Sequence, residues 1–155
     1  MSIFEDTAPR AVRHEPLRVA VLGASGSVGM QTLDVCRHFP QKVQVVALAV
    51  RSSAEFAVKA ANEFNCKYVA FADASVKGNV LLDALPQGCK ASFGPEAVQA
   101  LAELDEVDCV VNAVVGEAGI YAGLAAVKAD KVLAYANKES IVVGGDLLMP
   151  QVKPG

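Results

Sequence analysis

The stretch VAVLGASGSVG, from Val19 to Gly29, decides the fold expected of this chain. It begins as an apolar run typical of a buried strand and ends in three glycines, Gly23, Gly26 and Gly29. Glycines after a first strand permit a tight turn and let phosphates approach the backbone where the next helix begins. The spacing is a variant of the dinucleotide fingerprint G-x-G-x-x-G and predicts a bound nucleotide, although a turn without a ligand shows the same pattern. No Gly-Lys-Ser/Thr follows, which excludes a Walker phosphate loop.

The composition of the chain bounds its class. With 155 residues and a hydrophobic content of 53%, the chain is long enough for one compact domain with its own core. It has 14 basic and 17 acidic residues, and a net charge of −3 does not resemble the footprint of a nucleic-acid binder. The apolar runs are far shorter than a membrane span, and the N-terminus lacks the apolar segment of a secretory signal. We therefore expect a cytoplasmic protein with no nucleic-acid or membrane partner.

Cysteine and histidine are too scattered to predict a zinc site. The 4 cysteines form no CxxC pair, and the only 2 histidines are His14 and His38. We expect the cysteines to be small buried residues in a reducing compartment. His14 falls in the expected N-terminal tail and His38 on the outer face of the first helix, so neither is a candidate general acid or base.

Strand-like and helical patterns alternate along the chain. Apolar runs predict strands over 18–22, 43–50, 68–71, 91–93, 109–115 and 131–135. Helical patterns cover 28–39, 54–64, 75–85, 94–104, 119–129 and 138–148, the last broken at Gly144–Gly145. This alternation predicts an α/β, Rossmann-like, doubly wound and mostly parallel sheet covered on both faces. We expect a flexible tail over 1–16, one domain over 17–149 and the start of a linker over 150–155.

The end of the second predicted strand favours NADP over NAD. NAD sites usually place an acidic residue about 20 positions beyond the glycines, where it binds the ribose 2′-hydroxyl. At about that distance stand Arg51, Ser52 and Ser53, and the next acidic residue after them is Glu55. An arginine with hydroxyl neighbours suits a 2′-phosphate, which a carboxylate would repel. The alternative is that Arg51 is a solvated surface charge and that a serine caps the next helix.

A second polar group follows the last predicted strand. Asn137, Lys138 and Glu139 lie in AYANKESIVVGG, at the same sheet edge as the glycine turn. They could bind the nicotinamide ribose and an anionic substrate, with Lys138 directed at a phosphate; the alternative is a helix cap by Asn137 beside a solvated Lys-Glu pair. The loop in NAVVGEAG, over 112–119, could line the nicotinamide side of the cleft or be a plain connection.

Four stretches together, VLGASGSVGMQTLDVCR, VVALAV, NAVVGEAGI and ANKESIVVGG, resemble the N-terminal domain of 1-deoxy-D-xylulose 5-phosphate reductoisomerases. The resemblance covers about 18–149. It implies conversion of 1-deoxy-D-xylulose 5-phosphate to 2-C-methyl-D-erythritol 4-phosphate in non-mevalonate isoprenoid biosynthesis. It also implies NADPH as cofactor, a divalent metal, Mg or Mn, and a homodimer.

The resemblance carries individual roles to matching positions. By motif, it places cofactor contacts on Ser25, Gly26, Ser27, Val28, Arg51, Ser52, Ser53, Asn137 and Glu139. It places the substrate contact on Lys138. The family usually has a Gly-Lys-Asn type segment where this chain has Arg51 to Ser53, so the chain departs from the pattern there.

Family members are much longer than this chain, and their acidic metal-binding motif follows shortly after the ANKES helix. The resemblance therefore implies that the metal ligands, the lid and the C-terminal helical domain lie beyond these residues, and that this chain binds NADPH without catalysing alone. Two other functions remain open at this point. One is the cofactor domain of another NADP-dependent oxidoreductase, similar to semialdehyde or homoserine dehydrogenases. The other is a non-catalytic NADP sensor, complete at this length.

Overall fold

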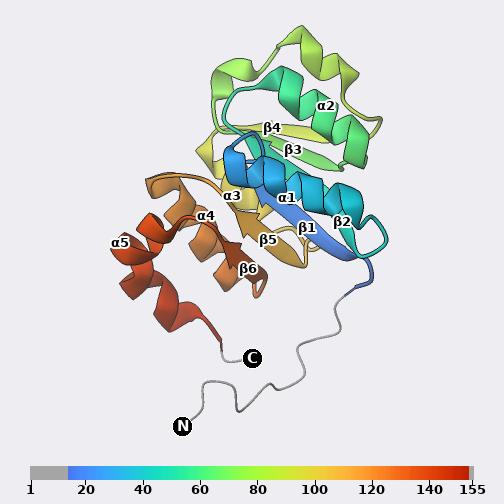
Figure 1. Cartoon of the computed structure of the whole chain (residues 1–155). Helices are drawn as coiled ribbons and strands as arrows, with labels where there is room; N and C mark the ends of the chain where they lie inside the picture. The colour runs from blue at the N-terminus through green and yellow to red at the C-terminus, as the bar shows by residue number, and fades with distance from the viewer. Residues whose placement is uncertain (1–13, 154–155) are drawn as a thin grey trace.

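A six-stranded sheet, parallel throughout, forms the centre of the molecule (Figure 1). The computed structural model describes residues 14–153. The sheet order is β4-β3-β2-β1-β5-β6. The strands are β1 (Leu17–Leu22), β2 (Val43–Val50), β3 (Tyr68–Phe71), β4 (Lys90–Phe93), β5 (Cys109–Asn112) and β6 (Val132–Tyr135). The expected Rossmann-like parallel sheet is thus confirmed.

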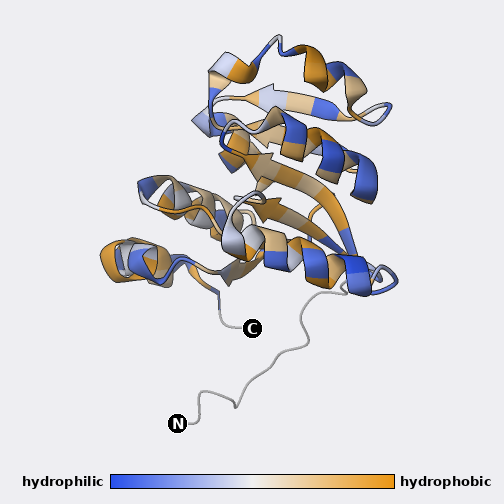
Figure 2. Cartoon of the chain, turned by 45° about the horizontal axis from the view of Figure 1, so that its top comes forward, coloured by the Kyte–Doolittle hydropathy of each residue, from blue (hydrophilic) through white to orange (hydrophobic). Residues whose placement is uncertain are grey.

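Helices cover both faces of the sheet. The helices are α1 (Ser27–His38), α2 (Ala54–Phe64), α3 (Pro95–Leu101), α4 (Glu117–Lys128) and α5 (Lys138–Leu148). Buried residues of α1 and α2 share one core cluster, and those of α3 and α4 share the other. Helix α5 packs on α4 rather than on the sheet. Figure 2 shows the strands as hydrophobic segments between helices that carry hydrophilic residues outward.

Alternation along β1 explains why both faces need cover. Val19 and Val21 point into the core under α1 and α2, whereas Ala20 and Leu22 point into the core under α3 and α4. All four are at most 3% exposed. A strand buried on both faces reads as a continuous apolar run, which is the pattern that the sequence shows. Burying a side chain the size of Leu22 stabilises the fold by about 2 kcal/mol.

The segment predicted as one helix over 75–85 is instead two short 3₁₀ turns, η1 (Ala74–Val76) and η2 (Val80–Ala84). Gly78 separates them with a φ of +86°, a conformation that no α-helix contains. The side chain of Asn79 then accepts a hydrogen bond from the amide of Leu81 and starts the second turn. The prediction of a continuous helix was wrong because the apolar spacing outweighed these two local signals.

Helix α5 runs without a break through Gly144 and Gly145, contrary to the sequence prediction. A Cβ on Gly144 would lie 3.0 Å from the Ile120 side chain of α4, so the glycine permits close packing of two helices rather than a turn. The strand predicted over 109–115 ends earlier, at Asn112, because the side chain of Asn112 takes over the hydrogen bonding of the chain beyond it.

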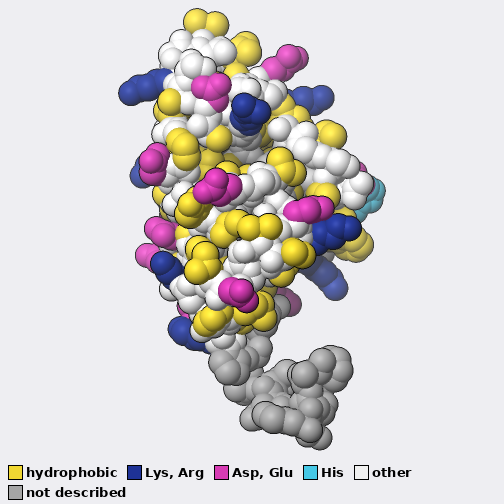
Figure 3. Space-filling view, turned by 90° about the vertical axis from the view of Figure 1, so that its left-hand side faces the viewer, with side chains coloured by type: hydrophobic (Ala, Val, Ile, Leu, Met, Phe, Trp, Pro, Cys, Tyr) yellow, Lys and Arg dark blue, Asp and Glu magenta, His cyan; other side chains and the backbone are white. Residues whose placement is uncertain are grey.

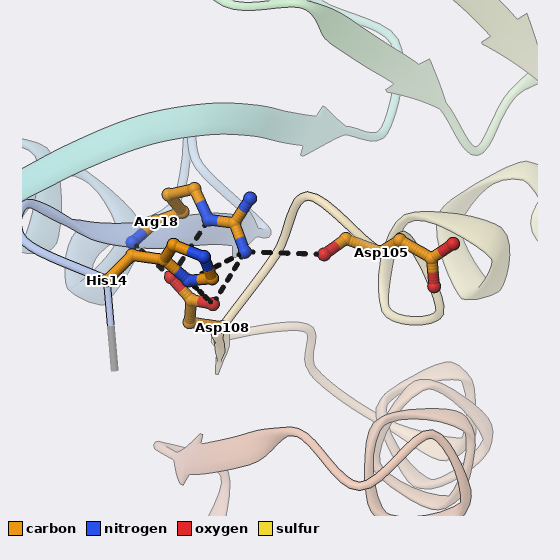
Figure 4. A network of polar contacts seen from close by, with 4 residues as sticks. All are labelled: His14, Arg18, Asp105 and Asp108. Carbon is orange, nitrogen blue, oxygen red and sulfur yellow. Dashed lines mark hydrogen bonds and ion pairs between the residues drawn. The ribbon is translucent and has the colours of Figure 1, made fainter. Parts of the chain in front are cut away.

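The chain enters the sheet through a charged contact. Residues 1–13 of the predicted tail lie outside the described residues, but His14 Nδ1 lies 3.0 Å from a carboxylate oxygen of Asp108 (Figure 4). Arg18 donates to both carboxylate oxygens of Asp108, at 2.8 and 3.0 Å. Asp108 immediately precedes β5, so this contact fixes the start of β1 against its neighbour.

Candidate functional site

The strand order of the sheet reverses between β1 and β5. From β1 the chain moves outward through β2, β3 and β4, then returns to β5 on the other side of β1. The helices that follow β1 and β5 therefore cover opposite faces of the sheet. Parallel α/β sheets bind nucleotides at the carboxyl edge, at such a reversal of the strand order. The glycine turn follows β1, and residues 113–116 follow β5. We call the second segment the β5 loop.

Two of the three glycines in the turn are required by the fold. Gly23 has a φ of +78°, and a Cβ there would lie 2.6 Å from the Ala113 carbonyl oxygen. A Cβ on Gly29 would lie 2.1 Å from the Gly23 carbonyl oxygen. Gly26 differs, because its φ is −77° and a Cβ would make only an ordinary contact of 3.4 Å. The fold itself does not require a glycine at 26.

The N-terminus of α1 is free to hold an anion. No side chain caps it and its first turn has no acidic residue. Gly26, Ser27 and Val28 are exposed there, and Ser25 is half-buried. The first amides of a helix have no partner within the helix and carry a partial positive charge. A pyrophosphate beside Gly26 would satisfy them.

Arg51 has an unpaired guanidinium, unlike the other described arginines. Arg18 is paired with Asp108, and Arg37 is paired with Glu63. Within residues 14–153 the exposed side chain of Arg51 makes no hydrogen bond or ion pair. It follows β2, the neighbour of β1, so it lies at the same sheet edge as the glycine turn.

The serines beside Arg51 are also exposed. Ser53 occupies the N-cap position of α2, but its side chain makes no capping hydrogen bond. Ser53 therefore occupies the capping position that the alternative interpretation expected, but its side chain does not cap the helix. The hydroxyls of Ser52 and Ser53 face solvent beside an uncommitted guanidinium, an arrangement that suits a phosphate group.

Asp73 is a neighbour of Arg51 that sequence reasoning missed. Its backbone amide donates to the Arg51 carbonyl oxygen at 2.9 Å. Hydrogen bonds from Ser75 lower the pKa of the Asp73 carboxyl group, and the positive charge of Arg51 adds to that effect. The signal that could have identified it is its position just after β3, the strand beside β2.

Asn137 caps α5, as one sequence interpretation expected. Its Oδ1 accepts a hydrogen bond from the Ser140 amide at 3.4 Å, and its Nδ2 donates to the Val114 carbonyl oxygen at 3.1 Å. The residue is 8% exposed, whereas Lys138 and Glu139 next to it are exposed. The structure thus places Lys138 and Glu139 on the surface at this edge and commits the polar atoms of Asn137 to the protein.

Buried polar residues hold the β5 loop. Asn112 is fully buried, donates to the Gly119 carbonyl oxygen at 2.7 Å and accepts from the Val114 amide at 3.2 Å. The Ser140 hydroxyl donates to the Gly116 carbonyl oxygen at 3.1 Å. Sequence reasoning assigned no role to Ser140. Its only signal was its position in the first turn of α5, directly before the apolar run 141–143.

A groove of about 420 Å³ opens between α4 and α5. Gly116, Glu117, Glu139 and Ser140 line it where it meets the β5 loop, and mostly apolar residues line the remainder. Figure 3 shows apolar and acidic side chains interspersed on the side of the molecule that carries α5. Val142 and Val143 are 84% and 79% exposed on that helix.

Residues 14–153 offer neither a cluster of metal ligands nor a helix that could span a membrane. Residues 14–153 contain no group of three or more histidine, cysteine, aspartate or glutamate side chains that could hold a metal ion. No helix of that part of the chain is long and apolar enough to cross a membrane. Cys36, Cys66 and Cys109 are buried as expected, whereas Cys89 is only half-buried. Burial raises the pKa of the Cys66 thiol to about 12.

The sequence is similar to curated reductoisomerases. Residues 19–145 match the family model described as 1-deoxy-D-xylulose 5-phosphate reductoisomerase. The protein of that name from Photorhabdus laumondii is 39% identical over 137 residues, which are 87% of this chain and 34% of the relative. The one from Clostridium perfringens is 36% identical over 138 residues, 88% of this chain and 36% of the relative. The chain thus spans about a third of the length of these relatives.

Solved structures agree with the sequence comparison. The reductoisomerase from Zymomonas mobilis in complex with NADPH superposes with a TM-score of 0.82 at 34% identity, over 88% of this chain and 36% of that one. A DOX-P reductoisomerase in complex with NADPH, fosmidomycin and magnesium gives a TM-score of 0.78 at 33% identity, over 87% of this chain and 33% of that one. Both likenesses extend across most of the described fold.

Proposed function

The chain belongs to the 1-deoxy-D-xylulose 5-phosphate reductoisomerase family, and we propose that it binds NADPH at the carboxyl edge of the sheet, where the strand order reverses between β1 and β5. Family membership decides against a cofactor domain of the semialdehyde or homoserine dehydrogenase kind. The observation that most directly supports the proposal is the N-terminus of α1, which begins after Gly26 and has no side-chain cap. A glycine that the fold does not require there leaves room for a pyrophosphate against the backbone.

The pyrophosphate, the 2′-phosphate and the nicotinamide half of the cofactor would each contact a different group of residues at the carboxyl edge of the sheet. The pyrophosphate would lie on Ser25, Gly26, Ser27 and Val28, which begin α1. The 2′-phosphate would lie on Arg51, Ser52 and Ser53, where the guanidinium is unpaired among the described residues. The nicotinamide half would lie between the β5 loop and the N-terminus of α5, near Asn137 and Glu139. Hydroxyl, amide and guanidinium groups are the donors that such a cofactor needs.

Lys138 is the residue that we assign to the substrate. Its ammonium is exposed at the same edge, beside the proposed nicotinamide site. A point charge at that place would attract the phosphate of 1-deoxy-D-xylulose 5-phosphate. The whole enzyme would first rearrange the ketose phosphate skeleton to an aldehyde. This chain would orient the nicotinamide against that aldehyde, and NADPH would supply the hydride that reduces it.

The described residues have no group of side chains that could hold the divalent metal. We assign Mg or Mn to a part of the family's chain other than residues 14–153, because these contain no ligand cluster for it. The activity of the whole enzyme, which forms 2-C-methyl-D-erythritol 4-phosphate in non-mevalonate isoprenoid biosynthesis, would need that part. A homodimer and a cytoplasmic location also belong to this proposal, and light scattering after size-exclusion chromatography tests the dimer.

Calorimetric titration of the 155-residue chain with NADPH and with NADH tests the proposal. A charge-assisted contact contributes about 1.5–3 kcal/mol, so we expect NADPH to bind about 10- to 100-fold more tightly. Arg51→Ala should remove that preference and leave NADH binding unchanged. Equal affinity for the two cofactors would contradict the assignment of Arg51, and binding of neither would contradict the function.

A further inference from the structure

The β5 loop is in direct backbone contact with the glycine turn. The Ala113 amide donates to the Leu22 carbonyl oxygen at 2.9 Å, and the Ala113 carbonyl oxygen lies 2.6 Å from the place of a Cβ on Gly23. No side chain separates the two segments. A shift of one segment therefore requires a shift of the other.

On its other side the β5 loop is held by the first turn of α5. Asn137 Nδ2 donates to the Val114 carbonyl oxygen, and the Ser140 hydroxyl donates to the Gly116 carbonyl oxygen at 3.1 Å. Lys138 and Glu139 lie between these two residues in the sequence. The turn that carries the proposed nicotinamide and substrate contacts is thus fastened to the β5 loop at two points.

The β5 loop has little room to move between these fastenings. Asn112, fully buried at its base, binds the Val114 amide and the Gly119 carbonyl oxygen. A Cβ on Gly119 would lie 2.4 Å from the Val114 carbonyl oxygen, so the loop sits tightly on the start of α4. All buried side-chain nitrogen and oxygen atoms in the described part of the chain have hydrogen-bond partners.

Helix α5 has few other contacts that could fix its first turn. It packs on α4 and not on the sheet, and an open groove lies along the boundary between the two helices. Val142 and Val143 of α5 are mostly exposed. Ser140 is 5% exposed and lies where the groove meets the β5 loop, so its hydroxyl is well placed to set the position of the turn.

We propose that Ser140 is a positioning residue that acts through the β5 loop. It sets the distance between the glycine turn and the residues at the start of α5, Asn137 to Glu139. This inference rests on the proposed function, because that distance is the one between the pyrophosphate and the nicotinamide half of NADPH. Removing the hydroxyl would leave the Gly116 carbonyl oxygen with its hydrogen bond from the Gly119 amide at 3.1 Å, while the helix gains a residue of high helix propensity. The pyrophosphate site itself would stay intact.

Two ligands separate positioning from a general structural role. NADPH reaches both turns, whereas 2′,5′-ADP carries only the adenosine half with its two phosphates. We expect Ser140→Ala to weaken NADPH binding about 5- to 10-fold and to change 2′,5′-ADP binding less than about 2-fold, because one hydrogen bond is lost. Ser140→Thr, which keeps a hydroxyl, should retain most of the NADPH affinity.

Ser92→Ala is the matched control. Ser92 lies on β4, and its hydroxyl also donates to a backbone carbonyl oxygen, that of Val69 on β3. Strand β4 forms the edge of the sheet opposite to β6. Both ligands should bind this variant as they bind the wild type, and thermal denaturation should show all variants folded. Equal losses of both ligands in Ser140→Ala, or no loss of NADPH, would overturn the positioning role. A wild-type chain that binds neither ligand would overturn the proposed function as well.

Discussion

The carbonyl oxygen of Gly23 lies 2.1 Å from the position that a Cβ on Gly29 would occupy. The first turn of α1 therefore rests on the end of β1 without space for a side chain. The oxygen is a backbone atom and the backbone fixes the position of a Cβ, so the contact cannot be relieved by rotating a side chain. The closeness of helix and strand is what presents the amides of the first turn at the sheet edge.

Gly29→Ala should destabilise the whole domain. The added methyl group would push α1 away from β1, where Gly29, Leu33 and Cys36 are the buried residues of the helix. Overpacking a tight backbone contact costs about 3 kcal/mol. The free energy of unfolding, measured by urea denaturation, should fall by about that amount. A loss below about 1 kcal/mol would show that the turn relaxes more readily than its geometry implies.

Gly26→Ala should weaken NADPH binding while leaving the stability of the domain nearly unchanged. Its Cβ would meet the protein only at an ordinary 3.4 Å contact, so the free energy of unfolding should change by less than about 1 kcal/mol. The same methyl group would stand in the proposed pyrophosphate site. NADPH affinity, measured by calorimetry, should fall at least about tenfold. An unchanged affinity would place the pyrophosphate elsewhere.

The Asp108 carboxylate should make the stability of the domain depend on acid pH. Hydrogen bonds from Arg18 hold the pKa of the Asp108 carboxyl group well below its usual range. A pKa lower in the folded than in the unfolded state stabilises the fold above the unfolded value of about 4, and this stabilisation is lost as the pH falls further.

Asp108→Asn isolates this contribution. It should lower the free energy of unfolding by about 2 kcal/mol at pH 7, because hydrogen bonds to a charged partner are lost. Urea denaturation between pH 7 and pH 3 should show the difference between wild type and variant narrowing below about pH 4. A difference that stays constant over that range would show that the charge of Asp108 contributes nothing.

Substitutions of Lys138 and Glu139 should affect different ligands, the substrate in the first case and the cofactor in the second. Both side chains are exposed at the same turn, but only Glu139 is assigned to the cofactor. Lys138→Ala should leave NADPH affinity within about 2-fold of wild type, whereas Glu139→Gln should weaken it about tenfold. In a full-length relative, replacing the matching lysine should raise KM for the sugar phosphate. Loss of NADPH binding in Lys138→Ala would reverse the two assignments.

Local patterns in the sequence were enough to predict the order of the elements. Apolar runs placed all six strands, and the buried positions of α1 recur at the predicted spacing. The predictions were wrong where a glycine has a role that spacing does not reveal. Gly78 interrupts a helical pattern because its φ is positive, and Gly144 continues a helix because Ile120 of α4 lies against it.

The glycine turn after a buried strand can be predicted from the sequence alone, because the residues that form it are neighbours along the backbone. Which polar groups remain available depends instead on the tertiary structure. Arg51 stays unpaired within the described residues while Arg18 is engaged by Asp108, 90 positions away. Ser140 reaches the carbonyl oxygen of Gly116, 24 positions away. Such contacts depend on how strands and helices pack, and composition and spacing do not specify them.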